Sequence, residues 1–333
     1  MAETPENPFQ DVLDALLDEG NPFPPRFLYR LSALEGKDLD PLGAVWPRIQ
    51  PQRRFNLLED LEELAETNLL LSFEAVCRLA LTDEEPRART LALRALWDSE
   101  EEDLIPIYLD ILANDPDPET RAQAASSSGH FVYLGEIEEI PEELFRQIEA
   151  RLLEIMDSDE PTLVRRRALE ALSFSGRSAV ESLIEEAYDY GDEDWLVSAL
   201  FAMGRSANPR WEPLVLEKLE DESERVQLEA ARAAGELDLQ DAYPALLDLL
   251  ASEDDELRMA AAWSLSQIGG EGVRQELETL LEETQDPVEA EFLEGALDNL
   301  SFTENVQDLN LLDLSDEDLD LYTGYNGDQG TSE

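Results

Sequence analysis

The chain is patterned as pairs of short amphipathic helices, and residues 241–270 contain one complete pair. Apolar side chains recur at helical spacing in its first half, at Ala242, Leu246, Leu247 and Leu250. After an acidic turn they recur on one face of the second half, at Leu257, Ala261, Ala262 and Leu265, before a Gly269-Gly270 helix stop. Helices of about a dozen residues are marginal alone, so the pair must bury its apolar faces against a neighbouring copy.

The same pattern recurs along most of the chain in a fixed register. Subtracting residue numbers gives a constant step of 31 between the equivalent second-helix positions Val164, Trp195, Val226, Leu257 and Val288. Ala88 and Thr120 extend this register upstream, with steps of 32 and then 44. Four residues after each register position a small residue recurs, at Ala92, Ala124, Ala168, Ala199, Ala230 and Ala261, until Phe292 ends the series. We therefore predict an all-α, right-handed α-α superhelix of seven or eight stacked helix pairs, with an inserted loop at 127–141 between two of them.

An acidic residue stands six positions before the arginine that opens several of the second helices. The three pairs are Asp83 with Arg89, Asp115 with Arg121, and Asp159 with Arg165. On these residues and the period, the chain resembles the HEAT repeats, in the short form called bilin-lyase-type HEAT-like repeats. In that family such pairs form a ladder between successive turns, which we expect to be interrupted here because Leu196 and Glu289 replace the arginine. The resemblance covers residues 70–300 and implies a fold rather than a function.

Composition divides the rest of the chain. Residues 1–25 contain five prolines and predict a flexible lead-in, residues 26–68 predict a helical cap, and residues 69–300 carry the repeats. Residues 301–333 contain nine acidic residues and no basic one, which predicts a flexible acidic tail. Its spaced leucines leave open that part of the tail docks on a partner or folds back over the last pair.

The charge limits the classes of partner. Acidic residues outnumber basic residues by 79 to 24, for a net charge of −55. Such a charge repels nucleic acids and anionic membranes, so we expect neither as a partner. Two interpretations stay open: a solvated surface adapted to high salt, or attraction of a basic protein partner.

The sequence offers little to a catalytic or metal site. Its one cysteine, Cys77, lies in an apolar run, and its one histidine, His130, lies in the predicted loop. Some HEAT-like enzymes, notably deoxyhypusine hydroxylase, hold two irons with paired His-Glu motifs, which a single histidine cannot supply. We expect no catalytic residue, cofactor or metal. The N-terminus lacks a secretion signal, so we also expect a cytoplasmic protein.

The second helices predict an interaction surface. Positions two and six residues after each register residue face away from the buried stripe. In three consecutive pairs these positions form what we call the apolar column: Val197, Phe201, Leu228, Arg232, Met259 and Trp263. Exposed apolar, aromatic and arginine residues together are typical of a protein-binding site. The alternatives are that neighbouring helices bury the column or that the tail covers it.

These features predict a non-enzymatic scaffold or adaptor that binds a basic helix or extended segment of another protein. The resemblance leaves one alternative from another class, a bilin-lyase-like subunit acting on a tetrapyrrole-carrying partner protein. A third interpretation is an acidic repeat protein whose charge reflects a saline environment.

Overall fold

The computed structural model of the protein describes residues 9–311, with side chains described for residues 9–305. Every regular element in residues 9–311 is helical, which confirms the predicted all-α class. The chain divides into two compact units, Met1–Ala202 and Met203–Glu333. No helix within residues 9–311 combines the length and apolar character that crossing a membrane requires.

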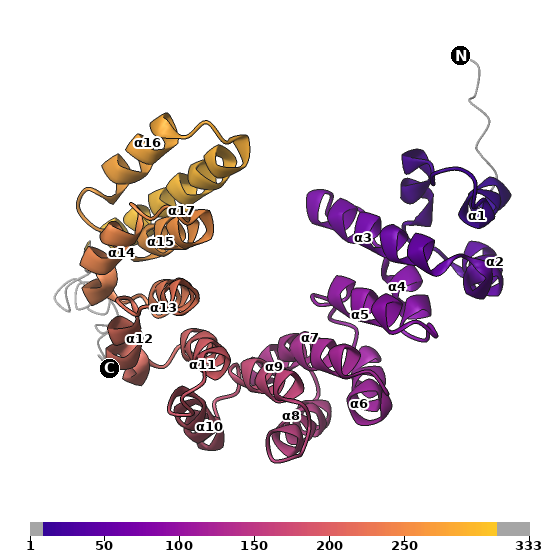
Figure 1. Ribbon diagram of the computed structural model, residues 1–333, viewed down its shortest axis with the longest axis horizontal. Helices are drawn as coiled ribbons and strands as arrows, with labels where there is room; N and C mark the ends of the chain where they lie inside the picture. Colours follow the sequence, from indigo (N-terminus) through magenta and orange to yellow (C-terminus); the bar gives the residue numbers. More distant parts are fainter. Residues whose placement is uncertain (1–8, 312–333) are drawn as a thin grey trace, which may run out of the picture. The chain divides into compact units, whose positions relative to one another are not determined.

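The first unit begins with α1, α2 and two short 3-10 segments and continues as helix pairs (Figure 1). Its elements are α1 Phe9–Leu17, η1 Pro25–Leu31, α2 Gly36–Val45, η2 Trp46–Arg48, α3 Pro51–Thr67, α4 Glu74–Ala80, α5 Pro86–Ala95, α6 Leu104–Asn114, α7 Pro118–Glu136, α8 Glu142–Met156, α9 Thr162–Leu172, α10 Ser178–Tyr188 and most of α11 Glu193–Arg205. Helices α3, α5, α7 and α9 pack in succession, each against the next. They form the layer of second helices in this unit.

The second unit repeats this two-layer arrangement. Its elements are η3 Pro209–Trp211, α12 Glu212–Lys218, α13 Glu224–Glu236, η4 Gln240–Ala242, α14 Tyr243–Leu249, α15 Asp255–Ile268, α16 Val273–Glu283 and α17 Pro287–Leu311. Helices α13, α15 and α17 lie side by side, and α12, α14 and α16 each pack against their own second helix (Figure 1).

Local sequence sets the ends of these helices. Prolines stand at the first turn of α3, α5 and α7, where a missing N–H costs no helical hydrogen bond. Asp254 caps α15 by accepting from the backbone N–H of Leu257 at 2.8 Å. The same helix ends at Gly269, whose φ of 73° is a conformation that L side chains rarely adopt.

The small residues of the repeat form the contact between second helices. Each of them is fully buried: Ala92, Ala124, Ala168, Ala199, Ala230 and Ala261. A small side chain at this place lets neighbouring helices approach closely, and Gly129 of α7 lies directly against the backbone of Ala171 in α9. The register read from the sequence therefore marks the core of the stack.

The structure corrects the predicted flexible lead-in over residues 9–17, whereas residues 1–8 lie outside the described residues. Residues 9–17 form α1, with Phe9, Val12, Leu13 and Leu16 buried. These four positions follow helical spacing, so the signal was present but was outweighed by the surrounding prolines.

The predicted inserted loop at 127–141 is also wrong over most of its length. Residues 127–136 continue α7, and only residues 137–141 connect it to α8. Phe131, Val132 and Leu134 are buried, because the longer α7 packs against both α8 and α9. The extra residues in the register therefore lengthen helices.

The predicted boundary of the acidic tail is displaced as well. Helix α17 continues from Pro287 to Leu311, so residues 301–311 belong to the last second helix. Residues 312–333 lie outside the described residues, and their assignment to a flexible tail stays a prediction.

Candidate functional site

The arginines that open the second helices each connect two neighbouring pairs. The guanidinium of Arg89 donates from Nη1 to the backbone oxygen of Asp83 in its own pair, at 2.8 Å. Its Nε and Nη2 donate to the two carboxylate oxygens of Asp115 in the next pair, both at 2.7 Å. This bidentate geometry is the strong form of an arginine–carboxylate contact, and it is almost fully buried.

The ladder starts earlier than the sequence predicts. Arg54 of α3 donates from Nη1 to both carboxylate oxygens of Asp83, at 2.8 and 2.7 Å. The indole N–H of Trp46 donates to the same carboxylate at 2.7 Å. Residues 26–68, predicted as a separate cap, thus supply the first step of the ladder.

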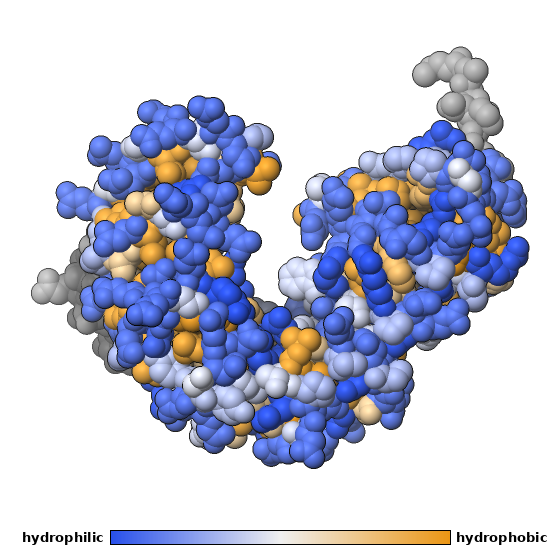
Figure 2. Space-filling view, in the orientation of Figure 1, coloured by the Kyte–Doolittle hydropathy of each residue, from blue (hydrophilic) through white to orange (hydrophobic). Residues whose placement is uncertain are grey.

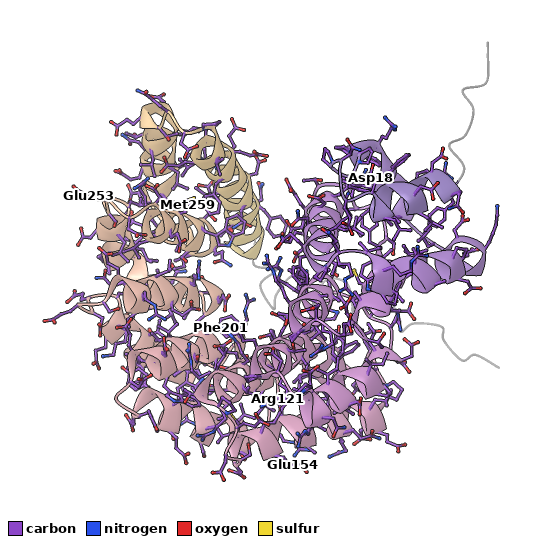
Figure 3. All side chains as sticks on the ribbon, turned by 45° about the vertical axis from the view of Figure 1, so that its right-hand side comes forward. Asp18, Arg121, Glu154, Phe201, Glu253 and Met259 are labelled. Carbon is purple, nitrogen blue, oxygen red and sulfur yellow. The ribbon has the colours of Figure 1, made fainter. Side chains whose placement is uncertain are left out.

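Further along the first unit the partners change. Arg121 donates to the backbone oxygen of Asp115 at 2.7 Å, and its Nη2 donates to Glu160 at 2.8 Å (Figure 3). Asp159, which the sequence pairs with Arg165, is exposed. Arg165 lies over the ring of Trp195 at 5.5 Å from its centroid. A cation–π contact therefore stands where an ion pair would continue the ladder.

The second unit contains one complete step. Arg258 donates from Nη1 to the backbone oxygen of Ser252 at 2.8 Å and from Nε to Glu289 at 2.7 Å. Glu289 stands where the sequence register has an arginine in other pairs, and it accepts this hydrogen bond from Arg258 of the preceding pair. Of the predicted ladder residues, Asp83, Arg89, Asp115 and Arg121 each contact another member of the set, whereas Asp159 is exposed and Arg165 lies against Trp195. A structural role for the ladder stays a prediction.

The apolar column is less exposed than its sequence positions predict. In the first unit Val197 and Phe201 of α11 are half-buried. In the second unit Leu228 of α13 and Met259 of α15 are half-buried, and α13 and α15 pack against each other. Figure 3 labels Met259 on α15. Only Arg232 and Trp263 are exposed among the six predicted residues.

Trp263 is the most accessible apolar residue of the column, at 40% exposed. Its ring contacts that of Phe292 on α17, with 6.0 Å between centroids. Phe292 is the residue that ends the series of small residues in the sequence, and this change from a small to an aromatic side chain is the sequence signal for the ring pair. Arg232 contacts Glu229 of its own helix at 3.4 Å.

A second aromatic group lies on the first unit, where sequence reasoning missed it. Trp97, His130 and Tyr133 form a row, with ring centroids 6.4 Å apart for Trp97 and His130 and 6.5 Å apart for His130 and Tyr133. Phe174 extends the row at 5.9 Å from Tyr133. His130 belongs to α7 rather than to a loop, and burial lowers its pKa although nearby acidic residues oppose the shift.

The described residues contain no group of three histidine, cysteine, aspartate or glutamate side chains placed to hold a metal ion. The surface shown in Figure 2 is mostly hydrophilic, with hydrophobic residues emerging in small groups.

Residues 196–258 and 212–297 match the family model for HEAT repeats. Residues 196–297 therefore consist of HEAT-like repeats. The match covers the helix pairs from α11 to α17, and the ladder and buried alanines extend the same construction through the first unit. No curated protein matches the sequence.

Several solved structures share the helical-repeat architecture at low similarity. YibA of Escherichia coli is 18% identical with a TM-score of 0.42, covering 85% of this chain and 99% of its own. The CpcE–CpcF complex of phycocyanin lyase from a Nostoc strain is 20% identical with a TM-score of 0.46, covering 68% of this chain and 94% of that one. The karyopherin Kap121p bound to the SUMO protease Ulp1p is 16% identical with a TM-score of 0.41, covering 86% of this chain and 36% of that one.

The residues that match the HEAT model include the apolar column but not the aromatic row of Trp97, His130 and Tyr133. All six residues of the apolar column and Phe292 lie within the matched residues 196–297. The aromatic row at Trp97 lies outside them, on helix pairs of the first unit.

Proposed function

We propose that this HEAT-like repeat protein is a non-enzymatic scaffold that binds another protein through the apolar column of its second helices. The observation that supports this proposal is Trp263, which is 40% exposed and is held by Phe292 beside the half-buried Met259 and Leu228. An accessible tryptophan held in place by a second aromatic ring is typical of a binding hot spot, where tryptophan and arginine are enriched.

The partner in this proposal carries basic residues. The net charge of −55 increases the rate of encounter with a basic protein and disfavours acidic competitors. The proposed partner is a basic helix or extended segment whose apolar residue covers Trp263. We further propose that the binding takes place in the cytoplasm.

The test compares affinity purifications from the native host using the full chain and a Phe201→Asp, Trp263→Asp double variant. A buried charge in place of a hot-spot aromatic should weaken the complex by about 2 kcal/mol or more, roughly 30-fold. The matched control is Tyr29→Asp, Phe302→Asp, which alters two aromatic residues that are 55% and 69% exposed. Circular dichroism establishes that both double variants are folded.

Proteins lost only from the column variant would support the proposal. Equal recovery with wild type and both folded variants would contradict it. The bilin-lyase-like alternative stays a prediction, and co-expression with a bilin and its acceptor tests it through pigment-dependent absorbance.

A further inference from the structure

A pocket of about 580 Å³ opens in the first unit, and none of its lining residues belongs to the apolar column. Its walls are the C-terminal half of α3, the start of α4 and the turn that follows α5. Its floor is apolar and buried, formed by Leu61, Phe73, Cys77 and Leu96. We call it the Trp97 pocket, because Trp97 stands at its edge. Its volume lies in the range of sites that accept a ligand or a few side chains.

The edge of the Trp97 pocket carries large apolar side chains that no other described residue covers. Leu69 is 93% exposed and Trp97 is 59% exposed, and both line the pocket. Leu70, next in the chain, is also 93% exposed. Single exposed apolar residues are common, but several around one hollow mark an interaction site. Trp97 is also held in place, since its ring contacts His130.

Six carboxylates surround this apolar floor. Two of them are neutralised locally, because Glu62 pairs with Arg94 and Glu74 pairs with Arg78. The other four have no ion-pair partner among the residues that the structure describes: Glu66, Asp98, Glu100 and Glu101. The Trp97 pocket therefore combines an apolar interior with an uncompensated negative edge.

This charge decides between the candidate occupants. The segment 312–333 of the same chain contains acidic residues and no basic residue, so the pocket repels it. A second copy of the chain brings a net charge of −55 and is disfavoured for the same reason. The complementary occupant is a cationic segment of a different protein.

We propose that the Trp97 pocket binds a short segment of another protein in which one large apolar residue is flanked by lysine or arginine. The apolar residue fills the space above Leu61 and Phe73. The flanking cations face Asp98, Glu100 and Glu101, and one of them lies against the exposed ring of Trp97. This site is separate from the apolar column and adds a second point of contact to the proposed scaffold.

The experiment selects binders from a phage-displayed library of random 12-residue peptides against the intact chain. Peptides that combine lysine or arginine with a large apolar residue should be enriched. The affinity of the best synthetic peptide is then measured by fluorescence anisotropy with folded variants. Trp97→Ala, and separately the triple variant Asp98→Asn, Glu100→Gln, Glu101→Gln, should each weaken binding about tenfold or more.

Two controls isolate the site. The triple variant Glu282→Gln, Glu283→Gln, Glu291→Gln removes the same amount of charge from exposed positions in the second unit and should leave the peptide affinity within about twofold of wild type. Trp263→Asp should also leave it unchanged, which separates this proposal from that of the apolar column. Failure to enrich basic peptides, or equal affinity for wild type and the Trp97→Ala variant, would overturn the proposal.

Discussion

The carboxylate of Asp83 is the most heavily used group of the ladder, and its removal provides a quantitative test of it. Its side chain is 0% exposed and accepts hydrogen bonds from Arg54 and from the indole N–H of Trp46. The backbone N–H of Glu85 donates to it as well, at 2.9 Å. Asp83 therefore joins α3, the segment after α2 and the turn that opens α5.

Substituting Asp83→Ala should lower the free energy of unfolding by about 3–5 kcal/mol, because the Arg54 charge stays buried without a counter-ion. The N–H groups of Trp46 and Glu85 also lose their acceptor. The matched control is Glu142→Ala, which removes the partner of Arg146. That pair is 60% and 73% exposed, so its loss should leave the free energy of unfolding nearly unchanged.

The assay is urea unfolding followed by circular dichroism, combined with hydrogen exchange of peptides from α3 to α5. Asp83→Ala should lower the unfolding midpoint and accelerate exchange in these helices first. The double variant Arg54→Met, Asp83→Leu removes both charges and should recover stability relative to Asp83→Ala. A loss below about 1 kcal/mol in Asp83→Ala would refute the inference that an uncompensated buried charge dominates there.

Three further predictions concern single positions. Burial lowers the pKa of His130 below 6.5, so its contribution to stability is present above about pH 6.5 and declines as the pH falls through the folded pKa. The chain has one histidine, so a single NMR titration curve measures this pKa, and a value above 6.5 would contradict the prediction. Burial raises the pKa of the Cys77 thiol to about 12, so a thiol reagent at pH 8 should label the protein only as denaturant unfolds it. Rapid labelling of the native protein would contradict the burial of Cys77 in the floor of the Trp97 pocket. A methyl group at Gly235 would lie 2.8 Å from the Cα of Ser264, so Gly235→Ala should destabilise the protein by about 1–3 kcal/mol in thermal unfolding. The control is Gly295→Ala, whose added methyl group would have no atom within 4 Å and should be neutral or stabilising.

The ladder shows the limit of reading partners from spacing. The acid six residues before each arginine suggested a local pair, and the structure does place Arg89 against the backbone oxygen of Asp83. Its side-chain partner, however, is Asp115 of the next pair. The stacking of two helix pairs decides which acidic residue the arginine contacts. Arg121, for example, contacts Glu160, whereas the neighbouring Asp159 is exposed.

The apolar column shows a similar limit. Helical periodicity correctly separates its residues from the fully buried face, because side-chain direction follows from the helix alone. The exposed fraction of each residue depends on the neighbouring second helix, which half-buries Leu228 and Met259 and leaves Trp263 accessible.

The sequence by itself determined the all-α class, the helix pairs and the buried alanines, because these follow from periodicity and side-chain size within about 30 residues. Tertiary structure alone decided that residues 127–136 extend α7, since their apolar face becomes buried only against α8 and α9. It also decided the Trp97 pocket, whose walls come from three segments separated along the chain. Exposure and cavities are properties of packed neighbours, and one-dimensional spacing does not contain them.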